Sequence, residues 1–158
     1  MIITLKDGSK KEYAEPKSVI DIAFDISEGL ARAACAGEVD GKVVDLRTIV
    51  DGDCEVNILT AKDEKGLAAL RHTASHVLAE AVQTLYPDAK VAIGPSIDTG
   101  FYYDFECPPF SREDLDAIEK EMKKIIKKGA KIERYTKSRE EAIAFFKEKN
   151  EPYKVELI

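Results

Sequence analysis

The 158-residue chain is poor in cysteine, which excludes several kinds of small protein. Its three cysteines, Cys35, Cys54 and Cys107, are far apart, and no CxxC pair occurs. Their spacing excludes a zinc ribbon or finger, and an odd, scattered count argues against a disulfide scaffold. We therefore expect reduced thiols, as is usual in the cytosol.

Long apolar runs are also missing. None approaches the ~20 residues that a membrane-spanning helix needs. The N-terminal "MIITLKDG" has neither the basic start nor the apolar stretch of a signal peptide. We expect a cytoplasmic protein with no membrane partner.

An excess of positive charge is absent as well, since the formal net charge is −6. A domain built to bind nucleic acid is usually basic, so any RNA contact must be local. The one basic concentration, Lys120 to Arg134, is typical of an exposed helix face whose lysines favour the negative end of the helix dipole.

Residues 1–61 alternate between strand-like runs and turns. Asp7, Asp40 and Asp51 each precede a glycine, a strong tight-turn signal between β-rich segments. Ser18 and Asp21 open an apolar pattern at helical spacing. This order predicts a small sheet with one helix across a face, a β-grasp fold.

Residues 62–158 form a second predicted domain, which makes the chain α+β. A helix is expected from about Asp63 to Tyr86, and Ser111 and Ser138 each open a further helix, the first ending at Gly129. Strands are expected at "AKVAIG", "FYYDFE", "AKIERYT" and "YKVELI". The chain stops within the last of these, so we expect a truncated domain.

The only two histidines, His72 and His76, lie four residues apart on the predicted long helix. At ~100° per residue they fall opposite an apolar stripe and beside small residues, as expected for the wall of a cleft. The stripe that we expect to face the core comprises Leu67, Leu70, Ala74, Val77, Leu78, Ala81 and Leu85.

Two imidazoles at this spacing can share a metal or act on one substrate. Thr73 stands where the HExxH zinc proteases have their glutamate base, which excludes that class. A zinc site needs three or four protein ligands, and Cys107 and Asp104 could add to the pair only if the fold brought them close. The sequence therefore predicts no metal site within this chain.

The segment "LRHTASHVLAEAVQTLYPDAKVAIGPSIDTGFYYDFE", with "KDGS", "IVDGDCEVNILT" and "EPYKVELI", resembles the N-terminal region of the threonyl-tRNA synthetase family. The resemblance covers essentially the whole chain: a TGS domain over residues 1–61 and part of an editing domain over residues 62–158. It implies an enzyme that attaches threonine to its tRNA with ATP, and an editing domain that hydrolyses seryl-tRNA. Because serine lacks only a methyl group, binding alone rejects it by ~1–3 kcal/mol, and a second, hydrolytic site is the usual remedy.

The resemblance implies catalytic roles for His72, His76 and Lys154, and a substrate-binding role for Tyr103. The cysteine and histidine that complete the family's editing motif have no counterpart here, nor does the aminoacylation core with its ATP, magnesium and zinc. We expect the chain alone not to charge tRNA and to edit poorly or not at all. The implied partners are threonine-specific tRNA and, for the parent enzyme, a second copy in a homodimer.

Two alternatives stay open. One is a non-catalytic RNA-docking or regulatory module that shares both domains. Residues 1–61 weaken an RNA role for the first domain, because they hold 7 Lys+Arg against 12 Asp+Glu, a net charge of −5. The other is a free-standing metal-dependent deacylase.

Overall fold

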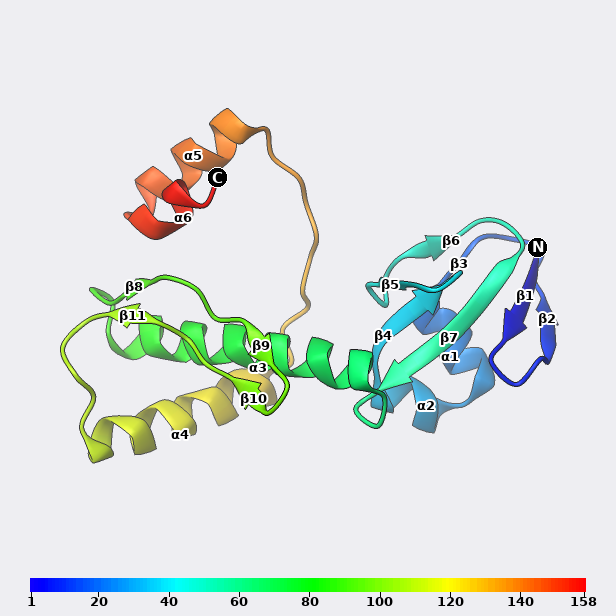
Figure 1. Cartoon of the computed structure of the whole chain (residues 1–158), viewed down its shortest axis with the longest axis horizontal. Helices are drawn as coiled ribbons and strands as arrows, with labels where there is room; N and C mark the ends of the chain where they lie inside the picture. The colour runs from blue at the N-terminus through cyan, green and yellow to red at the C-terminus, as the bar shows by residue number, and fades with distance from the viewer. The chain divides into compact units, whose positions relative to one another are not determined.

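The computed structural model describes all residues from Met1 to Ile158, and the chain forms two compact units. Unit 1 is Met1–Arg71 and unit 2 is His72–Ile158. The boundary predicted after residue 61 stays a prediction, because the helix α3 (Glu64–Leu85) is continuous through this region (Figure 1).

Unit 1 is built on a five-stranded mixed sheet in the order β2-β1-β7-β4-β5. The central pair, β1 and β7, is parallel, and the other neighbours are antiparallel. A further pair, β3 with β6, is separate, and α1 packs across the sheet together with the short α2 (Figure 1). The strands are β1 (Ile2–Leu5), β2 (Lys10–Glu12), β3 (Lys17–Ser18), β4 (Ala34–Val39), β5 (Lys42–Val44), β6 (Ile49–Val50) and β7 (Cys54–Thr60); the helices are α1 (Val19–Ile26) and α2 (Glu28–Ala33).

This arrangement confirms the predicted β-grasp fold, apart from α2, which the sequence pattern did not reveal. The Asp40-Gly41 turn joins β4 to β5 with φ of 47° and 80°, the left-handed values that a two-residue hairpin requires. The core between helices and sheet is apolar and consists of Ile3, Val19, Ile22, Ala23, Ala31, Val50, Val56 and Ile58.

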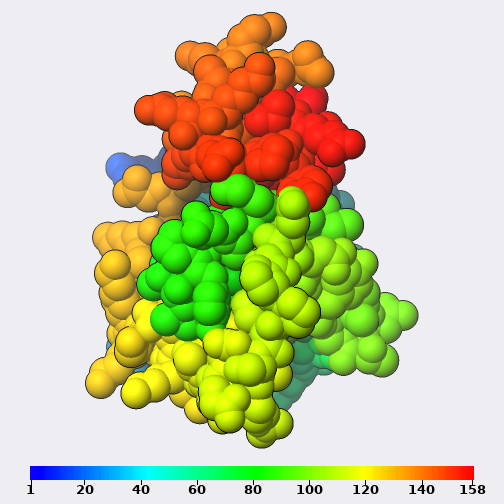
Figure 2. Space-filling view, turned by 90° about the vertical axis from the view of Figure 1, so that its left-hand side faces the viewer, coloured from blue at the N-terminus to red at the C-terminus, as the bar shows by residue number.

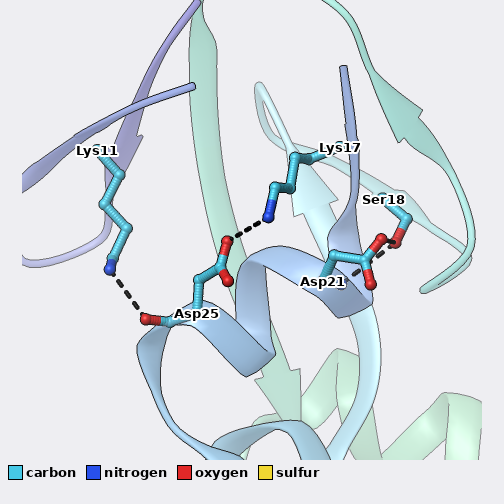
Figure 3. Close-up of polar contacts among 5 residues, drawn as sticks. All are labelled: Lys11, Lys17, Ser18, Asp21 and Asp25. Atoms are coloured by element: carbon cyan, nitrogen blue, oxygen red, sulfur yellow. Dashed lines mark hydrogen bonds and ion pairs between the residues drawn. The ribbon is translucent and has the colours of Figure 1, made fainter. Parts of the chain in front are cut away.

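The polar contacts around α1 join it to two strands (Figure 3). The Ser18 side chain accepts from the backbone N–H of Asp21 at 3.2 Å and caps the helix, as predicted. Lys17 forms an ion pair with the Asp25 carboxylate at 2.8 Å, and the Lys11 ammonium donates to the Asp25 carbonyl at 3.0 Å. Both lysines therefore tie α1 to the strands that precede it.

Unit 2 contains the rest of α3, a region of short strands and three further helices. Strand β9 pairs with β10, and β8 pairs with β11, so that residues 90–106 form an irregular hairpin. Helix α4 packs on α3 around Ala81, Val82 and Ile118. The elements are β8 (Lys90–Val91), β9 (Ser96–Ile97), β10 (Gly100–Phe101), β11 (Phe105–Glu106), α4 (Arg112–Lys128), α5 (Arg139–Glu148) and α6 (Pro152–Glu156).

The helix starts predicted in unit 2 are confirmed. Ser111 and Ser138 each cap a helix and form a capping box with the acidic residue three positions on. Gly129 ends α4 in the left-handed conformation, with φ of 61°. None of the helices has the length and apolar character that crossing a bilayer requires.

Two predicted strands are wrong. Residues 130–136, "AKIERYT", are exposed and have no regular structure, because no neighbouring strand offers them hydrogen bonds. "YKVELI" lies mostly in α6, where Pro152 at the first turn favours a helix. Its alternating apolar residues were too few to distinguish a strand from a helix. The expectation of a strand cut by the chain end is therefore wrong.

The predicted core stripe of α3 is wrong in part. Leu70 is 46% exposed and Leu85 is 37% exposed, whereas Ser75 is fully buried. The reason is that the helix is covered from two directions, by α4 near Val82 and by the β8–β9 connection near Ser75. A single-stripe pattern describes a helix with one covered face, and α3 has two.

The contact between β4 and α1 leaves no room for a side chain at Gly37. A Cβ there would lie 2.6 Å from Cγ1 of Val19, which is fully buried. We expect Gly37→Ala to lower the free energy of unfolding by about 1–3 kcal/mol. Gly29→Ala is the matched control, since Gly29 lies exposed in α2 with no atom closer than 4.0 Å. It should leave stability unchanged or raise it by up to ~1 kcal/mol. Urea unfolding of both variants checks this, and equal midpoints would contradict the close approach.

Candidate functional site

The two histidines lie side by side on α3, with both side chains exposed. Their ring centroids are 4.5 Å apart and the rings are tilted by 58°. The spacing of four residues on a helix produces this proximity. Both imidazoles can therefore act on one bound group, and neither serves the apolar core.

Ser75 holds this part of α3 against the residues that precede β9. It is fully buried, and its hydroxyl lies 2.7 Å from the carbonyl oxygen of His72 and 2.8 Å from that of Gly94. A buried hydroxyl needs such partners, because an unpaired one costs about 1–3 kcal/mol. The contact fixes the histidine helix relative to the segment that leads to Tyr103.

Tyr103 lies between β10 and β11 and is held from two sides. Its ring stacks on Phe105, with centroids 5.0 Å apart and an angle of 24° between the planes. The absence of a side chain at Gly94 leaves room for the other side of the ring. The tyrosine is thus fixed by packing, and its hydroxyl is available for a polar contact.

Lys154, on α6, provides that contact. Its ammonium donates to the Tyr103 hydroxyl at 3.2 Å and to the carbonyl of Ala92 at 3.1 Å. The same ammonium lies 5.8 Å from the centroid of the Tyr103 ring. Two residues 51 positions apart in the chain, predicted from the sequence to share a site, are in direct contact.

A pocket of about 530 Å³ opens beside these groups. The C-terminal helices lie directly against α3 and the strand region in Figure 2, where they are red and orange. His76, Tyr103 and Lys154 all line the pocket, whereas His72 lies next to it through its contact with His76. The remaining lining residues are Ala79, Glu80, Gln83, Thr84, Val91, Phe146, Lys149 and Glu151.

The surroundings of His76 favour its neutral form. Partial burial lowers the pKa of His76 below its ordinary value of 6.5, and the positive charges of His72 and Lys154 lower that pKa further. At neutral pH the ring therefore has a free nitrogen that can accept a proton. Lys154 is a cation within reach of the same space, so the pocket joins a proton acceptor to a positive charge.

Two residues of the pocket had no signal in the sequence. Gln83 and Glu151 hydrogen-bond to each other across the pocket wall, from α3 and from the start of α6. Neither was predicted as a site residue, because the contact joins positions 68 apart in the chain and no local pattern indicates it. No group of three or more His, Cys, Asp or Glu side chains is arranged to hold a metal ion.

Comparison with known proteins agrees with the fold of the first domain. Residues 1–60 match the TGS domain family. The whole chain is similar to the threonine--tRNA ligase of Acetivibrio thermocellus, with 61% identity over 157 residues, and to that of Caldanaerobacter subterraneus subsp. tengcongensis, with 55% identity over 159 residues. The Clostridium botulinum (strain Hall) enzyme is 56% identical over 157 residues.

These alignments cover 99–100% of this chain and 25% of each relative. The first sixty residues thus form a TGS domain. The chain as a whole corresponds to the N-terminal quarter of the threonine--tRNA ligases.

The charge on Lys154 should be detectable through His76. We expect His76 to titrate below 6.5, and Lys154→Met to raise its pKa toward that value, because a nearby positive charge is lost. Histidine ring signals followed by NMR against pH give both values, with His72→Gln to assign them. Lys120→Met, which removes an exposed lysine of α4, should leave the titration unchanged. A wild-type pKa at or above 6.5 would contradict the arrangement.

The close packing of Gly94 against Tyr103 gives a second test. A Cβ at Gly94 would lie 2.0 Å from Cδ2 of Tyr103, so Gly94→Ala must displace the ring. We expect a loss of about 1–3 kcal/mol in the free energy of unfolding and altered Tyr103 ring signals. Gly100→Ala is the control, because a Cβ there meets nothing within 4 Å. If both variants behave alike, Gly94 does not set the position of Tyr103.

Proposed function

We propose that the pocket is part of an editing site that hydrolyses serine from tRNA wrongly charged by a threonine--tRNA ligase. The observation that carries this is the convergence of His76, Tyr103 and Lys154 on one pocket, in a chain that matches the N-terminal quarter of these enzymes. The joining of threonine to tRNA, with its ATP, magnesium and zinc, is proposed to belong to the other three quarters of the relatives' length.

The chemistry needs a proton acceptor and a positive charge near the developing oxyanion, and the pocket offers a group for each. A water molecule attacks the ester carbonyl, and the neutral ring of His76 accepts its proton. The Lys154 ammonium stabilises the negative charge that develops on the carbonyl oxygen. The 3′ oxygen of the tRNA leaves and takes the proton, so that water and ester become serine and a free 3′ hydroxyl.

The other two residues have positioning roles in this proposal, one toward the substrate and one toward Lys154. His72, beside His76, can hydrogen-bond the terminal ribose, and the Tyr103 hydroxyl orients Lys154. Water and ester must be held together for the reaction to be fast, and such positioning accounts for a large part of most enzymatic rate enhancement.

The test uses a chimera in which this chain replaces the matched segment of the Acetivibrio thermocellus relative. Seryl-tRNA for threonine is supplied, and the release of serine is measured. We expect the double variant His72→Ala, His76→Ala to lose about 10²–10⁴-fold in rate, because a positioned proton acceptor contributes that much. Lys154→Ala should also lose activity, while Lys120→Ala, an exposed lysine on α4, should not.

An unchanged rate in the double histidine variant would overturn the proposal. Binding of seryl-tRNA without hydrolysis by the intact chimera would instead support a non-catalytic RNA-docking module. The isolated chain is expected to hydrolyse seryl-tRNA slowly or not at all, so it serves as a second reference.

A further inference from the structure

Glu151 is an anomaly that the proposed chemistry does not use. It is only 9% exposed, and its Oε2 atom is buried without any hydrogen-bond partner. Its Oε1 atom accepts a hydrogen bond from Nε2 of Gln83. A buried carboxylate with one unpaired oxygen costs at least ~1–3 kcal/mol, so its presence calls for an explanation.

Capping of α6 does not explain it. Glu151 occupies the N-cap position of that helix, but its side chain makes no capping hydrogen bond. Its backbone is already satisfied, since its N–H donates to the Phe146 carbonyl at 2.9 Å and its carbonyl accepts from Val155 at 3.3 Å. The carboxylate turns away from its own helix and toward α3.

Four residues from two segments meet at this pocket. His76 and Gln83 are seven residues apart, so they lie on one face of α3. Glu151 directly precedes α6, and Lys154 lies within it. The hydrogen bond between Gln83 and Glu151 therefore joins the start of α6 to the histidine-bearing face of α3, and all four residues line the same pocket.

Helix α6 needs such a contact. It has five residues, and an isolated helix of that length is not stable in water. It follows α5, and the residues that join α5 to α4, numbers 130–138, have no regular structure. Tertiary contacts must hold α6 in place, and the bond from Glu151 reaches the helix that carries the histidines.

We propose that the Gln83–Glu151 hydrogen bond is a positioning clamp that holds Lys154 opposite His76. The role of the clamp in catalysis rests on the proposed function. Its geometry does not depend on that proposal. Glu151 and Gln83 act through Lys154, so they are positioning residues.

The test is the titration of His76 in clamp variants. Gln83→Met breaks the clamp without any change of charge, and the side chain keeps its length. The hydrogen bonds of Lys154 and Tyr153 remain, but α6 is held less firmly, and the Lys154 ammonium moves away from the ring. The pKa of His76 should therefore rise toward 6.5. Glu151→Ala should also raise it, although the loss of a negative charge by itself would lower it.

Two further variants separate positioning from simple packing. Glu151→Gln keeps an acceptor for Gln83, so the pKa of His76 should stay at or below its wild-type value. The reversed pair, Gln83→Glu with Glu151→Gln, again has one donor and one acceptor. It should lower the pKa of His76 from the raised value of Gln83→Met toward the wild-type value. Glu156→Ala is the matched control, because it removes an exposed glutamate from the same helix.

The titratable groups that line the pocket around His76 are not altered by Gln83→Met. They are Glu80 on α3, Tyr103 between β10 and β11, Lys149 after α5, Glu151 before α6, and Lys154 on α6; His72 lies against the ring as well. A rise in pKa in Gln83→Met therefore reports a change in position rather than a change in the set of charges.

The outcome that would overturn the clamp is a His76 pKa in Gln83→Met equal to that of the wild type, in a protein where Lys154→Met raises it. The chimera adds an independent readout: Gln83→Met should slow the release of serine by about 10–100-fold, as expected for a misplaced catalytic group, and the reversed pair should restore it. If the intact chimera does not hydrolyse seryl-tRNA, the proposed function fails, and the titration still decides the clamp.

Discussion

The ammonium of Lys154 is the point on which the arrangement of the pocket depends. It joins the last helix of the chain to the carbonyl of Ala92 beside β8 and to the hydroxyl of Tyr103 before β11. Each of these partners is fixed by something else: Tyr103 by its stacking on Phe105, and the residues after Ala92 by the contact between Gly94 and the buried Ser75. A cation held by two neutral oxygens keeps its charge uncompensated, and it therefore remains able to act on the pocket.

This choice of partners has a chemical consequence. A lysine in an ion pair has much of its field cancelled by the carboxylate beside it, whereas Lys154 donates to a carbonyl and a phenol. Glu151, a carboxylate that lines the same pocket, is directed to Gln83 instead. The pocket thus holds positive charge near His76, and the two functions needed for ester hydrolysis, a neutral base and a cation, coexist.

The sequence predicted the parts of this structure that depend on local signals. Ser18, Ser111, Ser138 and Gly129 marked helix ends because capping depends on a single side chain or on a left-handed backbone, and both are readable from residue type. Asp40-Gly41 marked a hairpin for the same reason. The pairing of Tyr103 with Lys154 came from resemblance to a family, and no local pattern could have supplied it.

The errors arose where long-range contacts decide. "YKVELI" forms most of α6 because two effects outweigh its weak alternation of apolar residues. Pro152 favours the start of a helix, and Lys154 makes contacts at the pocket. The burial of Ser75, and the exposure of Leu70 and Leu85, depend on which segments cover α3, and a periodic pattern carries no information about a second covering segment. Glu151 was missed because its role depends on a partner 68 positions away.

The irregular residues 130–138 give the C-terminal helices a property that their contacts alone do not show. Nine residues that behave as a coil have an average span of about 16 Å, and a short covalent connection keeps its ends at an effective concentration in the millimolar range. Contacts that would be too weak to hold a free peptide are then sufficient to keep α5 and α6 on the pocket. The helices α5 and α6, which form one wall of the site, therefore behave like a covalently attached ligand. A few hydrogen bonds and the length of the preceding segment determine how much of the time they lie on the pocket.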